Sequence, residues 1–224
     1  MGTSHLEELY LGILLTLIVV VVARNFKISV WFYMVHSFLL GCIYLWYATH
    51  MNNPMMYLWF ASTFLSQIVL IPFAPGGLFY TIRRYKARET EPIVPFGVSI
   101  VFITILVGGT WQLFHYFIDF IAPTPGSVVE PSRSNLAIAF TIFALGIYTL
   151  LTRRDAIKTV IGLCILGNGI DLTLVDLTPT MAETAILGIL TDVIISVFIL
   201  LYISRLIYVK LGIVDTVKLS QLRH

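Results

Sequence analysis

Residues 28–48 read ISVWFYMVHSFLLGCIYLWYA, a stretch of 21 residues without Asp, Glu, Lys or Arg. As an α-helix this stretch would be about 31 Å long, which matches the roughly 30 Å hydrocarbon core of a bilayer. A helix is the natural form for such a segment, because it satisfies its own backbone hydrogen bonds in lipid. The stretch therefore predicts a membrane-spanning helix.

Six further stretches of similar length and apolar character occur along the 224 residues. The seven predicted spans cover about residues 7–23, 28–48, 54–74, 96–121, 135–152, 155–176 and 183–208. Pro72 and the run Pro75-Gly76-Gly77 are expected to end the third span, because proline lacks an N–H and glycine destabilises a helix. We therefore predict an all-α integral membrane protein with seven transmembrane helices.

The composition of the whole chain supports this class. Apolar residues make up 58% of the sequence and charged residues 12%, against roughly 45–50% and a quarter in soluble domains. These proportions exclude a soluble globular domain and a disordered chain. The net charge of +2 gives no basic footprint for a nucleic acid, so we expect the lipid bilayer and no nucleic acid among the partners.

The basic residues predict the orientation. Thirteen of the 14 Lys and Arg residues fall in alternate loops or at the C-terminal end, and Arg133 alone falls in a loop of the opposite set. The thirteen are Arg24, Lys27, Arg83, Arg84, Lys86, Arg88, Arg153, Arg154, Lys158, Arg205, Lys210, Lys218 and Arg223. The positive-inside rule then places the N-terminus outside and the C-terminus in the cytoplasm.

The loop at residues 123–131 is the best internal boundary. It contains three prolines in nine residues and separates four spans from three. We predict that residues 1–122 form an N-terminal four-helix membrane part and that residues 132–224 form a three-helix part.

Ionisable groups inside a span are costly in lipid and are functional hypotheses by default. Asp192 lies near the middle of the last span, beside Thr191 and one helical turn from Ser196. Its expected role is a proton relay near the membrane midplane. The alternative is a protonated Asp that only hydrogen-bonds a neighbouring helix.

The sixth span carries a polar face. Cys164, Asn168 and Asp171 follow at spacings of four and three, which places them on one side of a helix. Small residues accompany them and would allow a second helix to approach closely, namely Gly162, Gly167 and Gly169. This face either passes protons, with Asp171 and Asn168 in the relay, or holds helices together through Asn and Gly. Cys164 is expected to be a packed residue rather than a reactive thiol.

Three further polar residues extend the possible polar path. His36 is midway through the second span and is read as a hydrogen-bonded core histidine, with proton shuttling as the alternative. Gln67 precedes Pro72, where either a water-lined break or a simple kink is expected. Lys158 lies near the inner end of the sixth span, where we expect it to snorkel as an anchor, with a cytosolic proton port as the alternative.

Motifs for catalysis and for cofactors are missing from the sequence. Cys42 and Cys164 are far apart and too few for an iron–sulfur cluster or a zinc site, which need about four ligands. There is no Walker A pattern, no GxGxxG and no GxSxG elbow. We therefore expect no catalytic residue, no metal and no cofactor in this chain.

The last three spans resemble the small K subunit of respiratory complex I and the C subunit of multisubunit cation/proton antiporters. The resemblance rests on RRDAIKTVIGLCILGN at 153–168, TDVIIS at 191–196 and GIVDTVKLSQLR at 212–223. With four preceding spans and Ala61-Ser-Thr-Phe in the third, the whole chain resembles hydrogenase-4 component E. That family supplies a membrane subunit of formate hydrogenlyase-type group 4 nickel–iron hydrogenases.

The resemblance implies a non-catalytic membrane-arm subunit that helps couple electron transfer to proton or sodium translocation. It implies a multi-pass protein of the inner (cytoplasmic) membrane, with antiporter-like subunits and the membrane anchor subunit of the hydrogenase arm as partners. The nickel–iron and iron–sulfur centres would lie on partner subunits. Residues 132–224 would be the part that is similar to subunit K.

Two positions of the family's relay map onto this sequence. The family's acid in the last helix corresponds to Asp192, and its acid in the preceding helix corresponds to Cys164. A thiol in apolar surroundings is a poor proton carrier at neutral pH. The relay therefore uses Asp171, or water held by Asn168, or is interrupted in this chain. The alternatives for the whole chain are a subunit of a multisubunit cation/proton antiporter or of another complex-I-like dehydrogenase, and a scaffold that only joins membrane modules.

Overall fold

The computed structural model describes residues 2–50, 54–85, 94–121, 130–177, 197–199, 201–202 and 205–206. The elements in these ranges are helices joined by short turns. They are α1 (Gly2–Val22), α2 (Phe26–His50), α3 (Met55–Thr63), the π-helix η1 (Phe64–Leu70), α4 (Ile71–Phe73), α5 (Leu78–Tyr85), α6 (Phe96–Ile121), α7 (Glu130–Thr152) and α8 (Ala156–Leu177).

Five stretches of the described chain are long and apolar enough to cross a membrane. They are Phe26–His50, Met55–Arg83, Phe96–Leu113, Ser134–Thr152 and Ala156–Asp176. These stretches confirm an all-helical, multi-pass membrane architecture. The first predicted span falls within α1, a helix of 21 residues. Most of the last predicted span lies outside the described residues, although its pieces at 197–199 and 201–202 are helical and bury Val197 and Leu201.

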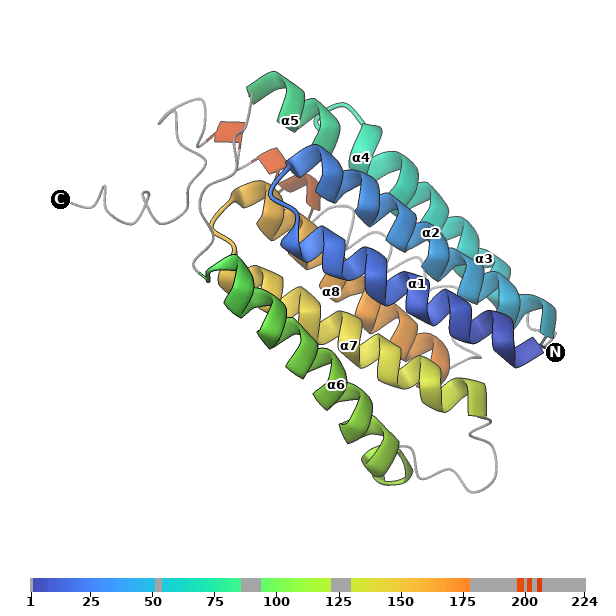
Figure 1. Cartoon of the computed structure of the whole chain (residues 1–224). Coiled ribbons are helices and arrows are strands. Elements are labelled where there is room, and N and C mark those ends of the chain that lie inside the picture. The colour runs from blue at the N-terminus through green and yellow to red at the C-terminus, as the bar shows by residue number, and fades with distance from the viewer. Residues whose placement is uncertain are drawn as a thin grey trace.

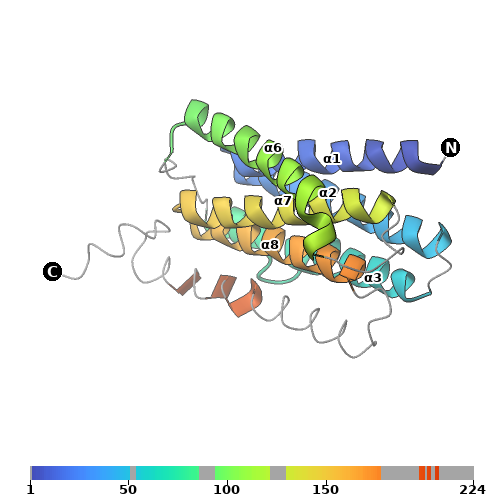
Figure 2. The ribbon, with the colours of Figure 1, turned by 90° about the horizontal axis from the view of Figure 1, so that it is seen from below.

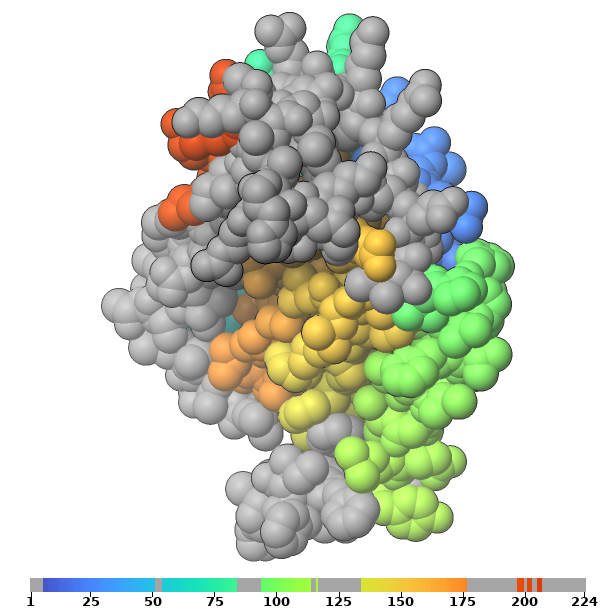
Figure 3. Space-filling model, turned by 90° about the vertical axis from the view of Figure 1, so that its left-hand side faces the viewer, coloured from blue at the N-terminus to red at the C-terminus, as the bar shows by residue number. Residues whose placement is uncertain are grey.

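The long helices lie side by side in one bundle (Figure 1). α1 and α2 run antiparallel, and α7 and α8 form a second antiparallel pair beneath them. α3 and η1 pack against α2, whereas α6 packs mainly on α7. From a perpendicular direction α6, α7 and α8 are visible next to each other on one face (Figures 2 and 3). The division predicted at residues 123–131 falls between α6 and α7, and one apolar core contains residues from both sides of it.

Glycines on α7 and α8 explain the closeness of this pair. A Cβ atom on Gly146 would lie 2.7 Å from the backbone of Leu166, and one on Gly169 would lie 2.5 Å from the backbone nitrogen of Phe143. Only a hydrogen at these positions allows the two backbones to meet. The close helix approach predicted for the glycines of the sixth span is therefore confirmed at Gly169, and the partner helix is α7 of the same chain.

The third span contains a π-helix that the sequence did not indicate. At its end the backbone N–H of Ile71 donates to the carbonyl of Ser66, five residues back, just before Pro72. The helix then stops at Phe73, as expected from the proline and glycine run. Gly76 adopts a φ of 92°, which favours glycine, and turns the chain into α5.

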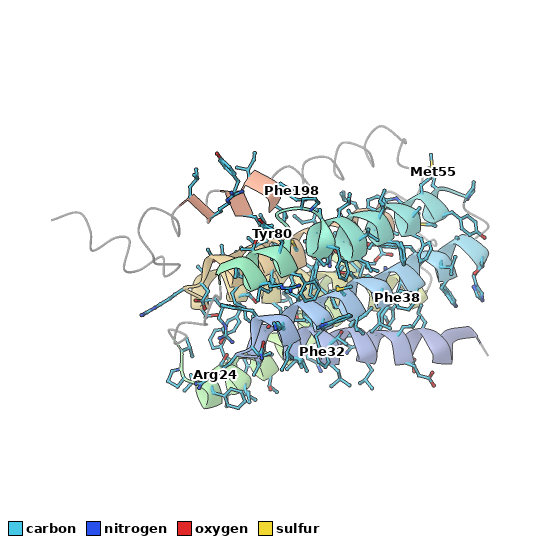
Figure 4. The ribbon with its side chains drawn as sticks, turned by 90° about the horizontal axis from the view of Figure 1, so that it is seen from above. Arg24, Phe32, Phe38, Met55, Tyr80 and Phe198 are labelled. Atoms are coloured by element: carbon cyan, nitrogen blue, oxygen red, sulfur yellow. The ribbon has the colours of Figure 1, made fainter. Side chains whose placement is uncertain are left out.

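The two ends of the bundle differ in charge. The α1–α2 and α7–α8 turns lie together, because the Arg153 guanidinium donates to the carbonyl of Val21. Contact between the rings of Trp31 and Phe79, 5.6 Å apart, brings α5 to the same end. We call this the basic end; its described basic residues are Arg24, Lys27, Arg83, Arg153, Arg154 and Lys158. Figure 4 shows Arg24 at this end and Met55 at the opposite one.

Candidate functional site

A line of polar side chains, buried except for the half-buried Asp176, follows the contacts of α2 and α8 with each other and with α1, η1 and α7. We call this line the polar seam. It consists of Ser29, Tyr33, His36, Ser37, Tyr44 and Tyr47 on α2, of Lys158, Cys164, Asn168, Asp171 and Asp176 on α8, and of Gln67 on η1 and Asn135 on α7. The α2 members recur mostly every three or four residues, which keeps them near one side of the helix.

Lys158 forms the basic end of the seam. Its side chain is fully buried, and its Nζ donates to the carbonyls of Val20 at 2.8 Å and Ala23 at 2.7 Å and to Ser29 Oγ at 2.5 Å. These carbonyls belong to the C-terminal end of α1, where they have no intrahelical partner and carry the negative end of the helix dipole. The expectation that Lys158 snorkels to the surface is therefore wrong, since a closer set of acceptors lies inside the bundle.

Two other groups complete this arrangement. The Arg153 guanidinium donates to the carbonyl of Val21, and Ser29 Oγ donates to the carbonyl of Val20 at 3.3 Å. Arg153 in the α7–α8 turn and Lys158 in the first turn of α8 thus cap the end of α1. A lysine held in this way links the two halves of the chain instead of leading to the surface.

Gln67 occupies the middle of the seam. Both the Tyr33 hydroxyl and the Ser37 hydroxyl donate to Gln67 Oε1, each at 3.0 Å. All three side chains are buried. Cys164 is also buried and faces Tyr33, as expected for a packed thiol. The π-helix therefore presents Gln67 to the interior of its own chain, and neither lipid nor a partner subunit covers it.

Three buried residues near the centre have polar atoms without a hydrogen-bond partner among the described residues. The atoms without a partner are both ring nitrogens of His36, both side-chain amide atoms of Asn168 and Oδ1 of Asp171. His36 is buried, as predicted for a core histidine, and its ring faces the backbone of Ile13 on α1. Buried polar atoms are nearly always satisfied by protein or by ordered water. The centre of the seam is therefore suited to hold water.

Asp176 closes the seam at the end opposite the basic end, and the sequence analysis missed it. Its Oδ2 accepts a hydrogen bond from Asn135 Nδ2 at 2.7 Å, and its Oδ1 accepts one from the Tyr47 hydroxyl at 3.3 Å. Tyr10 of α1 interacts with Tyr47, so four helices meet at this carboxylate. A signal was available: Asp176 ends the sixth predicted span and Asn135 begins the fifth, and an antiparallel pair brings these two positions together.

Tyr44 lies in the seam between Tyr47 and the centre of the bundle. It is 1% exposed and comes one helical turn before Tyr47, which bonds Asp176. Tyr33, deeper on α2, faces Cys164 and donates to Gln67. Polar side chains of α2 and α8 therefore recur along the interface from Asp176 to the centre of the bundle.

The structure thus unites most of the predicted polar residues and leaves one outside. Cys164, Asn168 and Asp171 share the buried face of α8 that their spacing predicted. Asp192 lies outside the described residues. Within the described ranges, no three His, Cys, Asp or Glu side chains are grouped as a metal ion would require.

Comparison with known proteins gives a match to one family model and matches to curated relatives. Residues 134–224 match the family model of NADH-ubiquinone/plastoquinone oxidoreductase chain 4L. Hydrogenase-4 component E from Escherichia coli strain K12 is 25% identical over 226 residues, which cover 99% of both chains. The chain is similar to hydrogenase-4 component E throughout. The component E proteins of Escherichia coli O157:H7 and Shigella flexneri give the same values, and no solved structure matches.

These matches confirm the resemblance deduced from the sequence. They also divide the polar seam of this component-E-like chain. The segment similar to chain 4L contains Asn135 and the seam residues of α8, whereas those of α2 and η1 precede it. The N-terminal helices therefore supply seven of the thirteen residues of the polar seam, and the 4L-like segment supplies the other six.

Proposed function

We propose that the chain is a non-catalytic membrane-arm subunit of a complex-I-related group 4 hydrogenase. The similarity to hydrogenase-4 component E over 99% of both chains carries this proposal. The subunit lies in the inner membrane with seven spans, its N-terminus outside and its basic end in the cytoplasm. The grouping of the described basic residues at one end of the bundle supports this orientation. Nickel–iron and iron–sulfur centres belong to the partner subunits.

The proposed role is to help couple electron transfer to the movement of protons or sodium. Asp192 acts as the relay residue of the last span. In the preceding helix Cys164 stands where the family has an acid, and Asp171 takes over the role of that acid. Asn168, one turn from Asp171, orients water beside it. The buried polar seam supports this role, because polar groups at membrane depth are costly and are retained mainly for function.

A second candidate follows from the chain 4L match. Residues 134–224 are similar to a subunit of an NADH-dependent oxidoreductase, so the chain would serve another complex-I-like dehydrogenase or a multisubunit antiporter. A purely structural scaffold is the third reading, and the capping of α1 by Lys158 favours it. In both cases the partners, rather than this chain, decide the reaction.

The first experiment identifies the chains that co-purify with a tagged copy in mild detergent, by mass spectrometry. We expect a nickel–iron large subunit together with antiporter-like chains and a membrane anchor subunit. Antiporter-like chains without a hydrogenase would establish the second candidate instead. Recovery of the tagged chain alone would refute the membrane-arm role.

The second experiment tests the relay in the intact complex. Asp192→Asn should abolish coupled ion movement while the complex still assembles, because the amide does not release and rebind a proton. Glu7→Gln is the matched control, since Glu7 is an exposed carboxylate on α1. Unchanged ion movement in Asp192→Asn would show that this residue is not the relay and would leave the scaffold reading.

A further inference from the structure

The polar seam ends at Asp176, a half-buried carboxylate that water can reach. We propose that Asp176, Tyr44 and Asp171 form a proton port that opens at the end of the bundle opposite the basic end. The port takes up a water-borne proton at Asp176 and passes it to Asp171. The role of the port in ion movement rests on the proposed function. The presence of the port rests on the geometry described below.

Asp176 lies where the buried interior meets the outside of the bundle. Its side chain is partly exposed, whereas Tyr47 and Asn135, which donate to it, are buried. The two donors use one lone pair on each carboxylate oxygen and fix the orientation of the group. The remaining lone pairs are available to water.

Polar atoms without partners continue inward from this carboxylate. Asn135 is fully buried, and its Oδ1 has no hydrogen-bond partner in the part of the chain that the structure describes. Deeper in the seam the same holds for Oδ1 of Asp171 and for both amide atoms of Asn168. Such atoms bind ordered water in folded proteins. Those of Asn135 and Asp171 mark the path by which water reaches Asp171, and those of Asn168 extend it one turn deeper.

Tyr44 supplies the step between the two acids. Five residues separate Asp171 from Asp176, which corresponds to a rise of about 7.5 Å along α8, too far for direct transfer. Tyr44 lies between them in depth: α2 and α8 both begin at the basic end, and Tyr44 is one turn, about 4.5 Å, deeper than Tyr47, which bonds Asp176. Its oxygen receives a proton from the Asp176 side while its own hydroxyl proton leaves toward Asp171. One proton enters and one is delivered, so the tyrosine is unchanged in composition.

Protons do not enter the seam at its basic end. Arg153 holds a positive charge there, and the side chains of Arg153 and Lys158 both donate to backbone carbonyls of α1. A positive charge with bound donors repels protons and accepts none. The port is therefore accessible from one end of the bundle. Within the part of the chain that the structure describes, the titratable groups packed near Asp176 are Tyr10 of α1 and Tyr44 and Tyr47 of α2.

Chemical labelling tests the port without reference to any hydrogenase. Asp176→Cys and Lys27→Cys are made in a Cys42→Ser background, and intact spheroplasts are treated with a membrane-impermeant maleimide. Because thiol labelling follows exposure, we expect Asp176→Cys to react at least about tenfold faster than Lys27→Cys. Inverted vesicles should show the reverse order. Labelling of Asp176→Cys from the cytoplasmic side only, or from neither side, would overturn the port.

Proton translocation by the intact complex tests the purpose of the port. Asp176→Asn and Tyr44→Phe should each lower the protons moved per turnover by at least about tenfold, a conservative expectation beside the roughly 100- to 10,000-fold contribution of a positioned proton-transfer group to a rate. Asp176→Glu should restore most of the ratio, and Glu7→Gln should leave it unchanged. A wild-type ratio in Asp176→Asn would overturn the proposal. If that variant does not assemble, the labelling experiment still decides. If the tagged chain co-purifies without hydrogenase partners and Asp176→Cys is still labelled from outside, the proposed function fails and the port stands.

Discussion

Replacement of Lys158 by methionine tests whether the buried lysine holds the two halves of the bundle together. Methionine keeps a similar length and an apolar stem, but it donates no hydrogen bond. In Lys158→Met the carbonyls of Val20 and Ala23 lose donors at 2.8 and 2.7 Å, and Ser29 loses a donor at 2.5 Å. We expect the variant to insert and fold with lower stability.

The magnitude follows from the groups left behind. Each buried acceptor without a partner costs about 1–3 kcal/mol. The Ser29 hydroxyl is 3.3 Å from the Val20 carbonyl and 3.4 Å from that of Ala23, so it satisfies one of them. The removed ammonium also no longer needs desolvation, which offsets part of the loss. The net destabilisation is then about 2–4 kcal/mol, the size expected when one partner of a buried polar network is removed.

The assay is thermal unfolding of the purified chain in mild detergent, followed by tryptophan fluorescence. At about 2–4 °C per kcal/mol for a chain of this size, Tm should fall by roughly 5–15 °C. Lys27→Met is the matched control, because Lys27 is an exposed lysine on the neighbouring turn and surface changes stay within about 0.5 kcal/mol. A Tm for Lys158→Met equal to that of Lys27→Met would refute the capping role.

Three further predictions concern packing and the centre of the seam. Gly169→Leu should abolish the monodisperse folded species in size-exclusion chromatography, since its Cβ meets α7 at 2.5 Å, whereas Gly108→Leu, with nothing within 4 Å, should behave as wild type. Gln67→Leu should lower the free energy of unfolding by about 2 kcal/mol, because two buried hydroxyls lose their acceptor; unchanged thermal unfolding would contradict the bonds at Gln67 Oε1. Tyr148→Phe should cost about 1 kcal/mol and, in a double-mutant cycle with Ser99→Ala, show coupling through the 2.6 Å hydroxyl pair; additive losses would count against that pair.

The helical membrane architecture could be predicted from the sequence because a bilayer imposes a length on each apolar segment. The shared face of Cys164, Asn168 and Asp171 could also be predicted, since the helical repeat fixes it without knowledge of the neighbours. Membership of a face is a local property. Which helix covers that face is not, and the spacing on α8 alone gave no indication that α2 would bring Tyr33 and Tyr44 to it.

The errors have the same origin. Depth in the membrane predicted that Lys158 would extend to the surface, but the carbonyl acceptors at the end of α1 are far away in the sequence. Asp176 was overlooked because an acid at the edge of a span is ordinarily solvated, and only the meeting of four helices makes it part of the interior. The π-helix at Gln67 arises from a shift of backbone hydrogen bonds, which leaves no mark in composition or periodicity.

The cap on α1 has a consequence for how the chain is made. Lys158 follows its acceptor Val20 by 138 positions, which corresponds to about 7–30 s of synthesis at the usual rate of roughly 5–20 residues per second. Throughout that interval the last carbonyls of α1 lack the Lys158 donor, because that residue has not yet been synthesised. The C-terminal end of α1 is thus completed by a residue of α8, so a chain released before residue 158 presents an N-terminal hairpin without this cap.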